Sequence, residues 1–178
     1  ELSALGELPN AAGTQRSHAF GVDVPGRKMA QIQAFASHLS FDQRPHHWLD
    51  WCSGKGHLGR WLTQDEQRLT CLEYDPALVQ AGHLLSRRLG VQAAHLHQDV
   101  LRDDAAERLD AGQTPVALHA CGDLHVRLLQ LAKQKGCTQL AVAPCCYNRI
   151  TAPHYQALSQ VAQASALRLS RDDLGLPL

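Results

Sequence analysis

Short apolar runs alternate with longer amphipathic segments along most of the chain after residue 47. Apolar runs of this length, bounded by turn-forming residues, are typical of buried strands. On this pattern we predict strands at residues 48–52, 69–73, 91–97, 115–119 and 140–143.

Apolar residues at helical spacing predict helices before and between these strands. Met29, Ile32 and Phe35, for example, follow this spacing ahead of the first strand. Asp75 followed by Pro76 marks a helix start, because an acceptor side chain precedes a residue whose φ is already helical. The predicted helices cover 27–39, 58–62, 76–89, 124–135 and 153–167, and a short helical connection covers 100–112.

Strands that alternate with helices are joined by right-handed crossovers and form a parallel sheet. Helices must then cover both faces of the sheet. The predicted fold class is therefore α/β: Rossmann-like and doubly wound, with a mainly parallel sheet. We predict an irregular N-terminal extension at 1–26 and a single domain at 27–178. Because the pattern contains five strands, we expect the chain to stop short of a larger sheet.

The charges of the chain balance, with 17 Lys and Arg against 17 Asp and Glu. This balance argues against a chain that binds nucleic acid over its whole surface. We find neither a signal peptide nor an apolar run of about 18 residues, and expect a cytoplasmic protein without a membrane span. The six cysteines lie mostly in apolar runs, where thiols behave as small buried hydrophobes, and this fits a reducing compartment.

The stretch LDWCSGKGHLGRWL at 49–62 places Gly54, Gly56 and Gly59 between the first strand and a helix. A Walker phosphate loop is excluded, because Leu49 and Gly56 occupy positions that need a glycine and a hydroxyl. The glycines alone also match a dinucleotide turn, and an inert structural turn is a third interpretation.

Acidic residues after three successive strands favour S-adenosylmethionine over a dinucleotide. Asp50 would repel a pyrophosphate, whereas it would attract a ligand that carries an ammonium and a sulfonium. Glu73 can accept from the ribose hydroxyls and Asp99 from the adenine amine, with Gln98 or Val100 beside the ring. Asp50-x-Cys52-x-Gly54-x-Gly56 also matches a D/E-x-G-x-G-x-G signature, with Cys52 in the first glycine's place.

Two further stretches follow the last two predicted strands, HACGDLH at 119–125 and APCCYN at 143–148. They should lie at the same edge of the sheet as the glycine turn. His119, Asp123 and His125 are candidate bases, and Tyr147 could position a flat acceptor. Alternatively, Asp123 caps a helix, and the other residues of these stretches only turn the chain.

Cys145 and Cys146 have two possible chemical roles in the second of these stretches. One of them could attack an acceptor covalently beside the methyl donor. They could instead bind a metal with His119, Cys121 and His125, but the paired spacing of structural zinc sites is absent, so no obligate metal is expected. Plain packing of small side chains is the third interpretation.

The glycine turn, HACGDLH and APCCYN together resemble a family of Rossmann-like S-adenosylmethionine-dependent methyltransferases. The family includes methyltransferase-like proteins and the methyltransferase part of glutathione-S-transferase C-terminal-domain-containing protein. The tRNA ribose methyltransferase of the acceptor stem is similar more distantly. The resemblance covers about residues 27–174. It implies a seven-stranded sheet, the cofactor S-adenosylmethionine and, as the first acceptor to consider, RNA.

The residue pattern and the resemblance together give two sets of expected site residues. The cofactor set is Lys28, Asp50, Cys52, Gly54, Gly56, Glu73, Asp75, Gln98, Asp99, Val100 and His119, and the catalytic set is His119, Asp123, Cys145, Cys146 and Tyr147. Gln31 stands where relatives carry an acid, and Asn148 where they often carry a histidine. An NAD(P)-dependent oxidoreductase and a non-catalytic cofactor-binding or scaffold module remain the alternatives.

Overall fold

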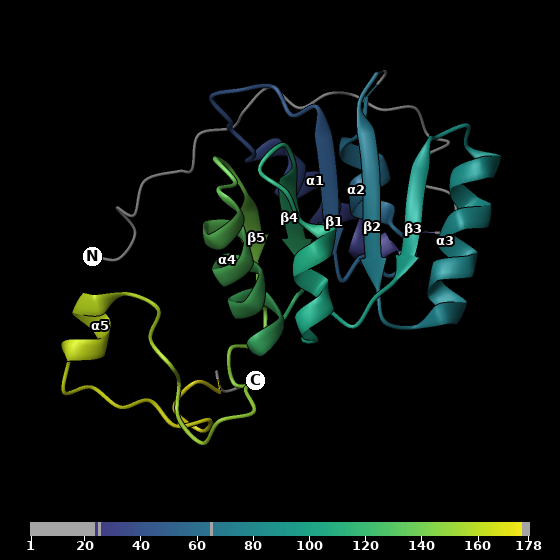
Figure 1. Ribbon diagram of the computed structural model, residues 1–178. Coiled ribbons are helices and arrows are strands. Elements are labelled where there is room, and N and C mark those ends of the chain that lie inside the picture. The colour runs from purple at the N-terminus through teal and green to yellow at the C-terminus, as the bar shows by residue number, and fades with distance from the viewer. Residues whose placement is uncertain (1–23, 25, 65, 176–178) are drawn as a thin grey trace, which may run out of the picture.

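The computed structural model describes residues 24, 26–64 and 66–175, so nearly all of the predicted extension at 1–26 lies outside the described residues. Five strands form one sheet in the order β3-β2-β1-β4-β5, and every neighbouring pair is parallel (Figure 1). The strands are β1 (His47–Trp51), β2 (Arg68–Glu73), β3 (Ala93–His97), β4 (Thr114–Leu118) and β5 (Ala141–Ala143). The predicted α/β parallel fold is confirmed.

Helices cover both faces of the sheet, as predicted (Figure 1). One face carries α1 (Gly26–Ser37), α2 (His57–Leu62) and α3 (Pro76–Arg88), and the other carries the 3-10 helix η3 (Asp103–Arg108) and α4 (Asp123–Lys135). Successive residues of β1 point to opposite faces, so Trp48 joins the core beneath α1 and α2, while Leu49 joins the core beneath η3 and α4. Burial on both faces explains why β1 shows no polar alternation.

The predicted helix at 153–167 is wrong. Only Gln160–Ala164 is helical there (α5), within a long excursion that an antiparallel bridge between His154 and Ser170 closes. The apolar residues that suggested the helix have no sheet face to cover, and Val161 is 85% exposed. A helix without a packed face gains little stability from its spacing alone, so the segment is mostly irregular.

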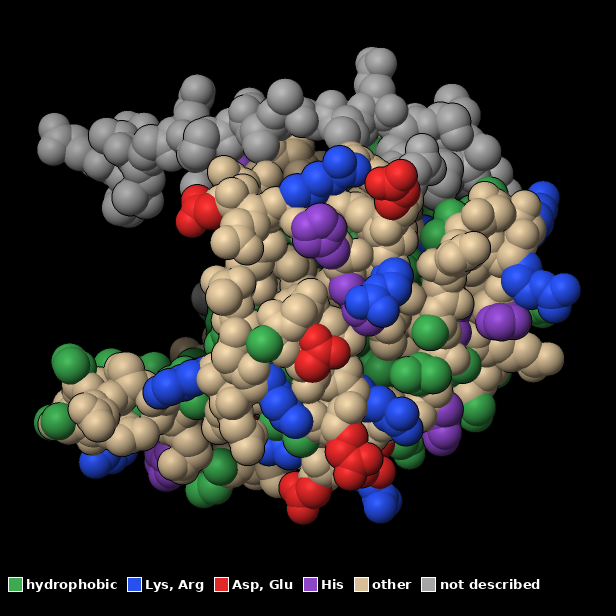
Figure 2. All heavy atoms as spheres, turned by 45° about the horizontal axis from the view of Figure 1, so that its top comes forward, with side chains coloured by type: hydrophobic (Ala, Val, Ile, Leu, Met, Phe, Trp, Pro, Cys, Tyr) green, Lys and Arg blue, Asp and Glu red, His purple; other side chains and the backbone are tan. Residues whose placement is uncertain are grey.

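Charged side chains of both signs are interspersed on one face of the molecule (Figure 2). On the face seen in Figure 2, the Lys and Arg side chains of the described residues lie singly among acidic and histidine side chains. Within the described part of the chain, none of the helices combines the length and the apolarity needed to cross a membrane.

The strand order reverses between β1 and β4, which lie side by side in the sheet. In open parallel sheets, ligands bind beyond the carboxyl ends of the strands near this switch point. All five strands point the same way, so the segments that follow them meet at one edge. These segments are the glycine turn, residues 74–75, residues 98–101, HACGDLH and APCCYN.

Gly122 is required at the start of α4 because of both its conformation and its surroundings. Its φ is 57° and its ψ −129°, and a Cβ there would lie 1.6 Å from the carbonyl oxygen of Arg149. We expect Gly122→Ala to lower the free energy of unfolding by about 3 kcal/mol or more, since strained backbone and steric overlap add. Urea unfolding measures the loss.

Gly136, at the C-terminus of the same helix, supplies the matched control. Its φ is also positive at 75°, but a Cβ there would meet nothing within 4 Å. Gly136→Ala should therefore cost only about 1 kcal/mol. Equal losses in the two variants would contradict the packing of Arg149 against Gly122.

Candidate functional site

A cavity of about 380 Å³ lies beyond the carboxyl ends of β2 and β3. Its walls combine apolar side chains with two carboxylates and one amide. The lining residues are Cys52, Leu72, Glu73, Tyr74, Gln98, Asp99, Val100, Leu101 and Leu124. The segments that follow three parallel strands supply most of this wall, and five of the nine residues belong to the predicted cofactor set.

The glycine turn is attached to the end of β2 by hydrogen bonds, including one from the N–H of Ser53 to the carbonyl of Leu72 over 2.9 Å. The N–H of Gly54 donates to Oε2 of Glu73 over 2.8 Å. Gly54 has a φ of 57°, and the Nζ atom of Lys28 lies 3.7 Å from the place where its Cβ would stand. Lys28, on α1, therefore brings a positive charge to the turn beside the acid of β2.

Cys52 adopts a left-handed conformation, with a φ of 56°. This region costs most residues free energy but not glycine, which explains why the signature prefers glycine at this position. Burial raises the pKa of the Cys52 thiol to about 12, and the carboxylates of Glu73 and Asp50 add to the shift. Cys52 is therefore a neutral thiol in the cavity wall.

Glu73 and Asp99 present half-buried carboxylates to the cavity. The second oxygen of Glu73 accepts from the N–H of Asp75 over 3.0 Å, and Oδ1 of Asp99 accepts from the N–H of Leu101 over 3.0 Å. A carboxylate has about four acceptor sites, so both groups retain capacity for hydroxyl or amine donors of a ligand.

Gln98 and Asp75, both predicted to touch the cofactor, make hydrogen bonds within the protein. The amide of Gln98 donates to Asp104 and accepts from Arg108. Oδ1 of Asp75 accepts from the N–H of Ala77 over 2.8 Å, so the predicted helix cap is confirmed. Asp75 does not line the cavity, whereas Gln98 contributes to its wall beside Val100.

Tyr74 and Leu101 line the cavity although the sequence analysis did not single them out. Tyr74 is 68% exposed and Leu101 48% exposed, unusual for such large apolar groups. The sequence does offer a sign of both residues, because each is a large side chain close after an acid at a strand end. Tyr74 directly follows Glu73, and Leu101 comes two residues after Asp99. Together with Val100 they offer apolar surface against which a flat ring can pack.

Asp50 lies beneath the glycine turn and does not line the cavity. Its Oδ2 accepts from the N–H of Gly59 over 2.8 Å, and the side chain is 2% exposed. A Cβ on Gly59 would lie 2.5 Å from Leu69, so α2 packs tightly on the sheet here. Burial raises the pKa of Asp50 to about 6, although the bond from Gly59 and the charge of Lys28 lower it.

A buried arginine supports the turn from the other side. Arg60 donates to the carbonyl of Lys55 over 2.5 Å and to Oγ of Ser86 over 3.1 Å. Ser86 in turn bonds Nε2 of His95 over 2.8 Å. Burial and the positive charge of Arg60 lower the pKa of His95 to about 4, so this histidine is neutral at pH 7.

HACGDLH and APCCYN lie side by side, joined by backbone hydrogen bonds. The N–H of His119 donates to the carbonyl of Ala143, and that of Asp123 to the carbonyl of Arg149. The carboxylate of Asp123 accepts from the N–H of Thr151 over 2.7 Å. Asp123 therefore secures the segment after APCCYN in this structure.

His119 and Tyr147 are the exposed aromatic groups of this rim. His119 has a φ of 68°, and its Nε2 lies 3.0 Å from Oε1 of Gln31. The ring of Tyr147 packs edge-on against His125 with centroids 5.7 Å apart. Neither His119 nor Tyr147 lines the cavity beyond β2 and β3.

A family model described as a methyltransferase domain matches residues 12–153. The chain belongs to this methyltransferase family. A search of curated proteins gave no significant match. The match includes the whole sheet and all residues of the two predicted site sets.

In this methyltransferase, the predicted burial of the cysteines holds only in part. All six are free thiols; Cys71 and Cys121 are buried, whereas Cys145 is exposed. Sγ of Cys145 lies 3.0 Å from that of Cys121 and 3.5 Å from that of Cys146. The thiol contact with Cys121 raises the pKa of Cys145 to about 12, while for Cys121 the hydrogen bonds from Cys145 and Cys146 outweigh burial and lower the pKa.

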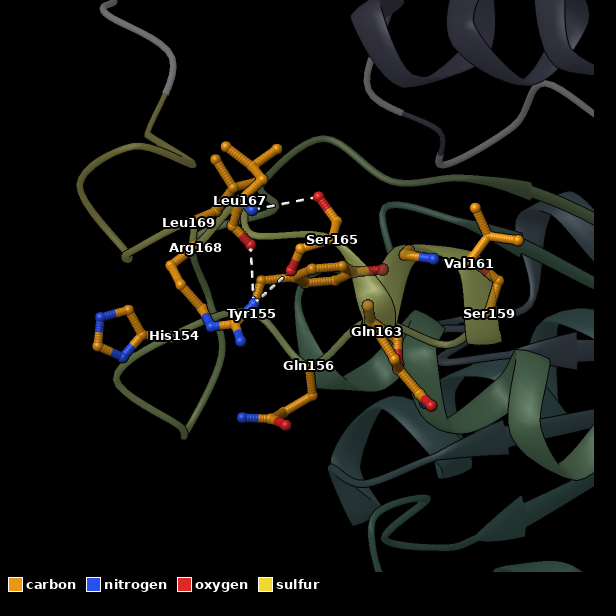
Figure 3. A pocket seen from close by; sticks show the side chains of 12 residues that line it. His154, Tyr155, Gln156, Ser159, Val161, Gln163, Ser165, Leu167, Arg168 and Leu169 are labelled. Atoms are coloured by element: carbon orange, nitrogen blue, oxygen red, sulfur yellow. Dashed lines mark hydrogen bonds between the residues drawn. The ribbon is translucent and has the colours of Figure 1, made fainter.

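The methyltransferase also has a larger hollow, of about 790 Å³, in its C-terminal excursion. Residues between His154 and Leu169 form its entire lining, around Tyr155 and Arg168 (Figure 3). None of the predicted site residues borders it, and no strand contributes to it. We therefore assign the candidate site to the cavity beyond β2 and β3.

The raised pKa of Asp50 predicts a pH-dependent contribution to stability. The carboxyl titrates near 3.8 in the unfolded chain and near 6 in the folded methyltransferase, so only the folded state holds the proton between these values. Raising the pH through this window therefore destabilises the wild-type protein. The side chain of Asp50→Asn can still accept from the N–H of Gly59, but it does not titrate. The free energy of unfolding of Asp50→Asn, relative to that of the wild type, should therefore rise by about 2 to 3 kcal/mol between pH 4 and 7.

Urea unfolding at a series of pH values gives this difference directly. His95, whose pKa is also shifted, is present in both proteins and cancels in the comparison. A difference that stays constant across the range would contradict the buried ionisation of Asp50.

Proposed function

We propose that this methyltransferase uses S-adenosylmethionine, bound in the cavity beyond β2 and β3. The observation that carries the proposal is the pair of carboxylates, Glu73 and Asp99, on the walls of one partly apolar cavity beside the glycine turn. When bound, S-adenosylmethionine supplies a methyl group made electrophilic by its sulfonium.

The residues of the cavity fit the separate parts of this cofactor. Glu73 has acceptor capacity for the two ribose hydroxyls, and Asp99 for the exocyclic amine of adenine. Tyr74, Val100 and Leu101 provide the apolar surface for the base. Lys28, beside Gly54, carries the charge that suits the carboxylate of the methionine part.

The same contacts argue against a dinucleotide. A pyrophosphate in a Rossmann turn is bound by backbone N–H groups of the turn. Here Oε2 of Glu73 already accepts from the N–H of Gly54. A phosphate would have to displace this carboxylate and would be repelled by its charge, whereas an uncharged ribose is not.

Asp50 acts indirectly under this proposal. Its bond to Gly59 fixes the start of α2 and hence the glycine turn. Cys52, Gly54 and Gly56 shape the turn itself, and Gln98 holds the loop that carries Asp99.

The acceptor binds at the rim formed by HACGDLH and APCCYN, which adjoins the glycine turn at the switch point. The exposed ring of Tyr147 offers a stacking surface for a flat acceptor. The imidazole of His119 can take up a proton that such an acceptor releases. RNA is the first acceptor class to test, on the family resemblance, although the interspersed charges in Figure 2 offer no broad phosphate-binding face among the described residues shown there.

Calorimetric titration of the purified chain with S-adenosylmethionine, S-adenosylhomocysteine and NAD⁺ tests the cofactor. We expect the first two to bind and NAD⁺ not to bind. Glu73→Ala and Asp99→Ala should each weaken binding of S-adenosylhomocysteine by about 1 to 3 kcal/mol, because a hydrogen bond to a charged group is lost.

Glu107→Ala is the matched control, since Glu107 is an exposed acid of η3 that does not line the cavity. It should bind as tightly as wild type. Binding of NAD⁺ alone, or unchanged affinity in both Glu73→Ala and Asp99→Ala, would refute the proposed cofactor site.

A further inference from the structure

Three thiols converge at the rim from two segments far apart in the sequence. Cys121 belongs to HACGDLH, and Cys145 and Cys146 to APCCYN. All three Sγ atoms lie within 4.8 Å of one another, and two of the pairs are 3.0 and 3.5 Å apart. We call Cys121, Cys145 and Cys146 the trithiol cluster.

The spacing of these sulfurs suits a single metal ion. Thiolates bind Zn²⁺ at about 2.3 Å, so three of them around one ion lie about 3.8 to 4.0 Å apart. Two of the observed separations are 0.3 to 1.0 Å shorter than these values, and the third, between Cys121 and Cys146, is no more than 4.8 Å. Small rotations of the side chains therefore suffice to bring all three sulfurs to one ion.

The backbone around the trithiol cluster is held in place without any ligand. The bonds from His119 to Ala143 and from Asp123 to Arg149 link the two segments on both sides of Cys121. The bond from Thr151 to the carboxylate of Asp123 adds a third link. Preformed ligand geometry of this kind lowers the entropic cost of metal binding.

Exposure within the trithiol cluster is graded. Cys121 is buried at its base, Cys146 is half-buried and Cys145 is exposed. An ion can therefore enter from solvent and keep one coordination position open on the side of Cys145. Sets of three protein ligands with an open position are typical of exchangeable or reactive sites, whereas structural zinc sites use four.

We propose that Cys121, Cys145 and Cys146 form a binding site for one thiophilic d¹⁰ cation, Zn²⁺ or Cu⁺. Each thiol loses its proton to solvent as its metal–sulfur bond forms, and no oxidation or reduction takes place. Thiolate ligands favour these ions over Mg²⁺ or Ca²⁺, which take oxygen ligands. The site does not depend on the proposed cofactor, because none of the three cysteines lines the cavity beyond β2 and β3.

The test uses the full chain, reduced with a phosphine and freed of metal by a chelator. Titration with Cd²⁺, followed by thiolate-to-metal charge-transfer absorption, should give one ion per chain. Competition with chromophoric chelators in separate Zn²⁺ and Cu⁺ titrations then shows which ion binds more tightly. Cys121→Ser, Cys145→Ser and Cys146→Ser should each weaken binding at least about tenfold.

Cys137→Ser is the matched control, since Cys137 is half-buried and lies outside the trithiol cluster. It should bind Cd²⁺ as wild type does. Circular dichroism checks the fold of each variant, and the exposed Cys145→Ser keeps the test valid if the buried Cys121→Ser is destabilised.

Absence of the charge-transfer band in the reduced wild-type protein would overturn the proposal. So would equal affinity in all three cluster variants, or an equal loss in Cys137→Ser. The reduced chain could also fail to bind Cd²⁺, Zn²⁺ and Cu⁺, while mass spectrometry of the oxidised chain shows a loss of two mass units. That result would overturn the proposal and show that two of the thiols form a disulfide instead.

Discussion

The carboxylate of Glu73 joins the segments that form the proposed cofactor site. One oxygen accepts from the N–H of Gly54 and the other from that of Asp75, so a single side chain joins the glycine turn to the end of β2 and the start of α3. The turn can adopt this position only because Gly54 tolerates a positive φ. The same hydrogen bonds place negative charge where a dinucleotide would bring phosphate, which is the reason for proposing a cofactor without a phosphate group.

A buried polar network keeps that turn in position. Asp50 bonds the backbone of α2, and Arg60 bonds the carbonyl of Lys55 and the hydroxyl of Ser86 on α3. Burying such charged groups is costly unless their hydrogen bonds are satisfied. The network therefore fixes one arrangement of turn and helices, and Asp50 takes part in it although it lies outside the cavity.

The rim beside the cavity is built differently. HACGDLH and APCCYN follow two neighbouring parallel strands, and backbone hydrogen bonds continue to join them after the sheet ends. The left-handed residue His119 and the closely packed Gly122 let the chain leave β4 and enter α4 within a few residues. This compact crossing brings Cys121 next to Cys145 and Cys146, which a longer loop would not.

The sequence by itself determined how strands and helices succeed one another along the chain as far as β5. Burial of one or both faces of an element leaves a periodic pattern of apolar residues in the sequence. The sequence also determined that the glycine turn and the residues around Glu73 and Asp99 lie at one edge, since parallel strands must end together. The helix predicted at 153–167 was wrong because a periodic pattern shows only that a segment could bury one face. The apolar residues there have no surface to pack against.

Only the tertiary structure decided which way individual side chains face. It turned Asp50 under α2, set Tyr74 and Leu101 beside the acids, and brought the sulfurs of three cysteines, which the sequence placed only at one edge, within 4.8 Å of one another. These outcomes depend on contacts between segments distant in the sequence, and local spacing carries no information about such contacts.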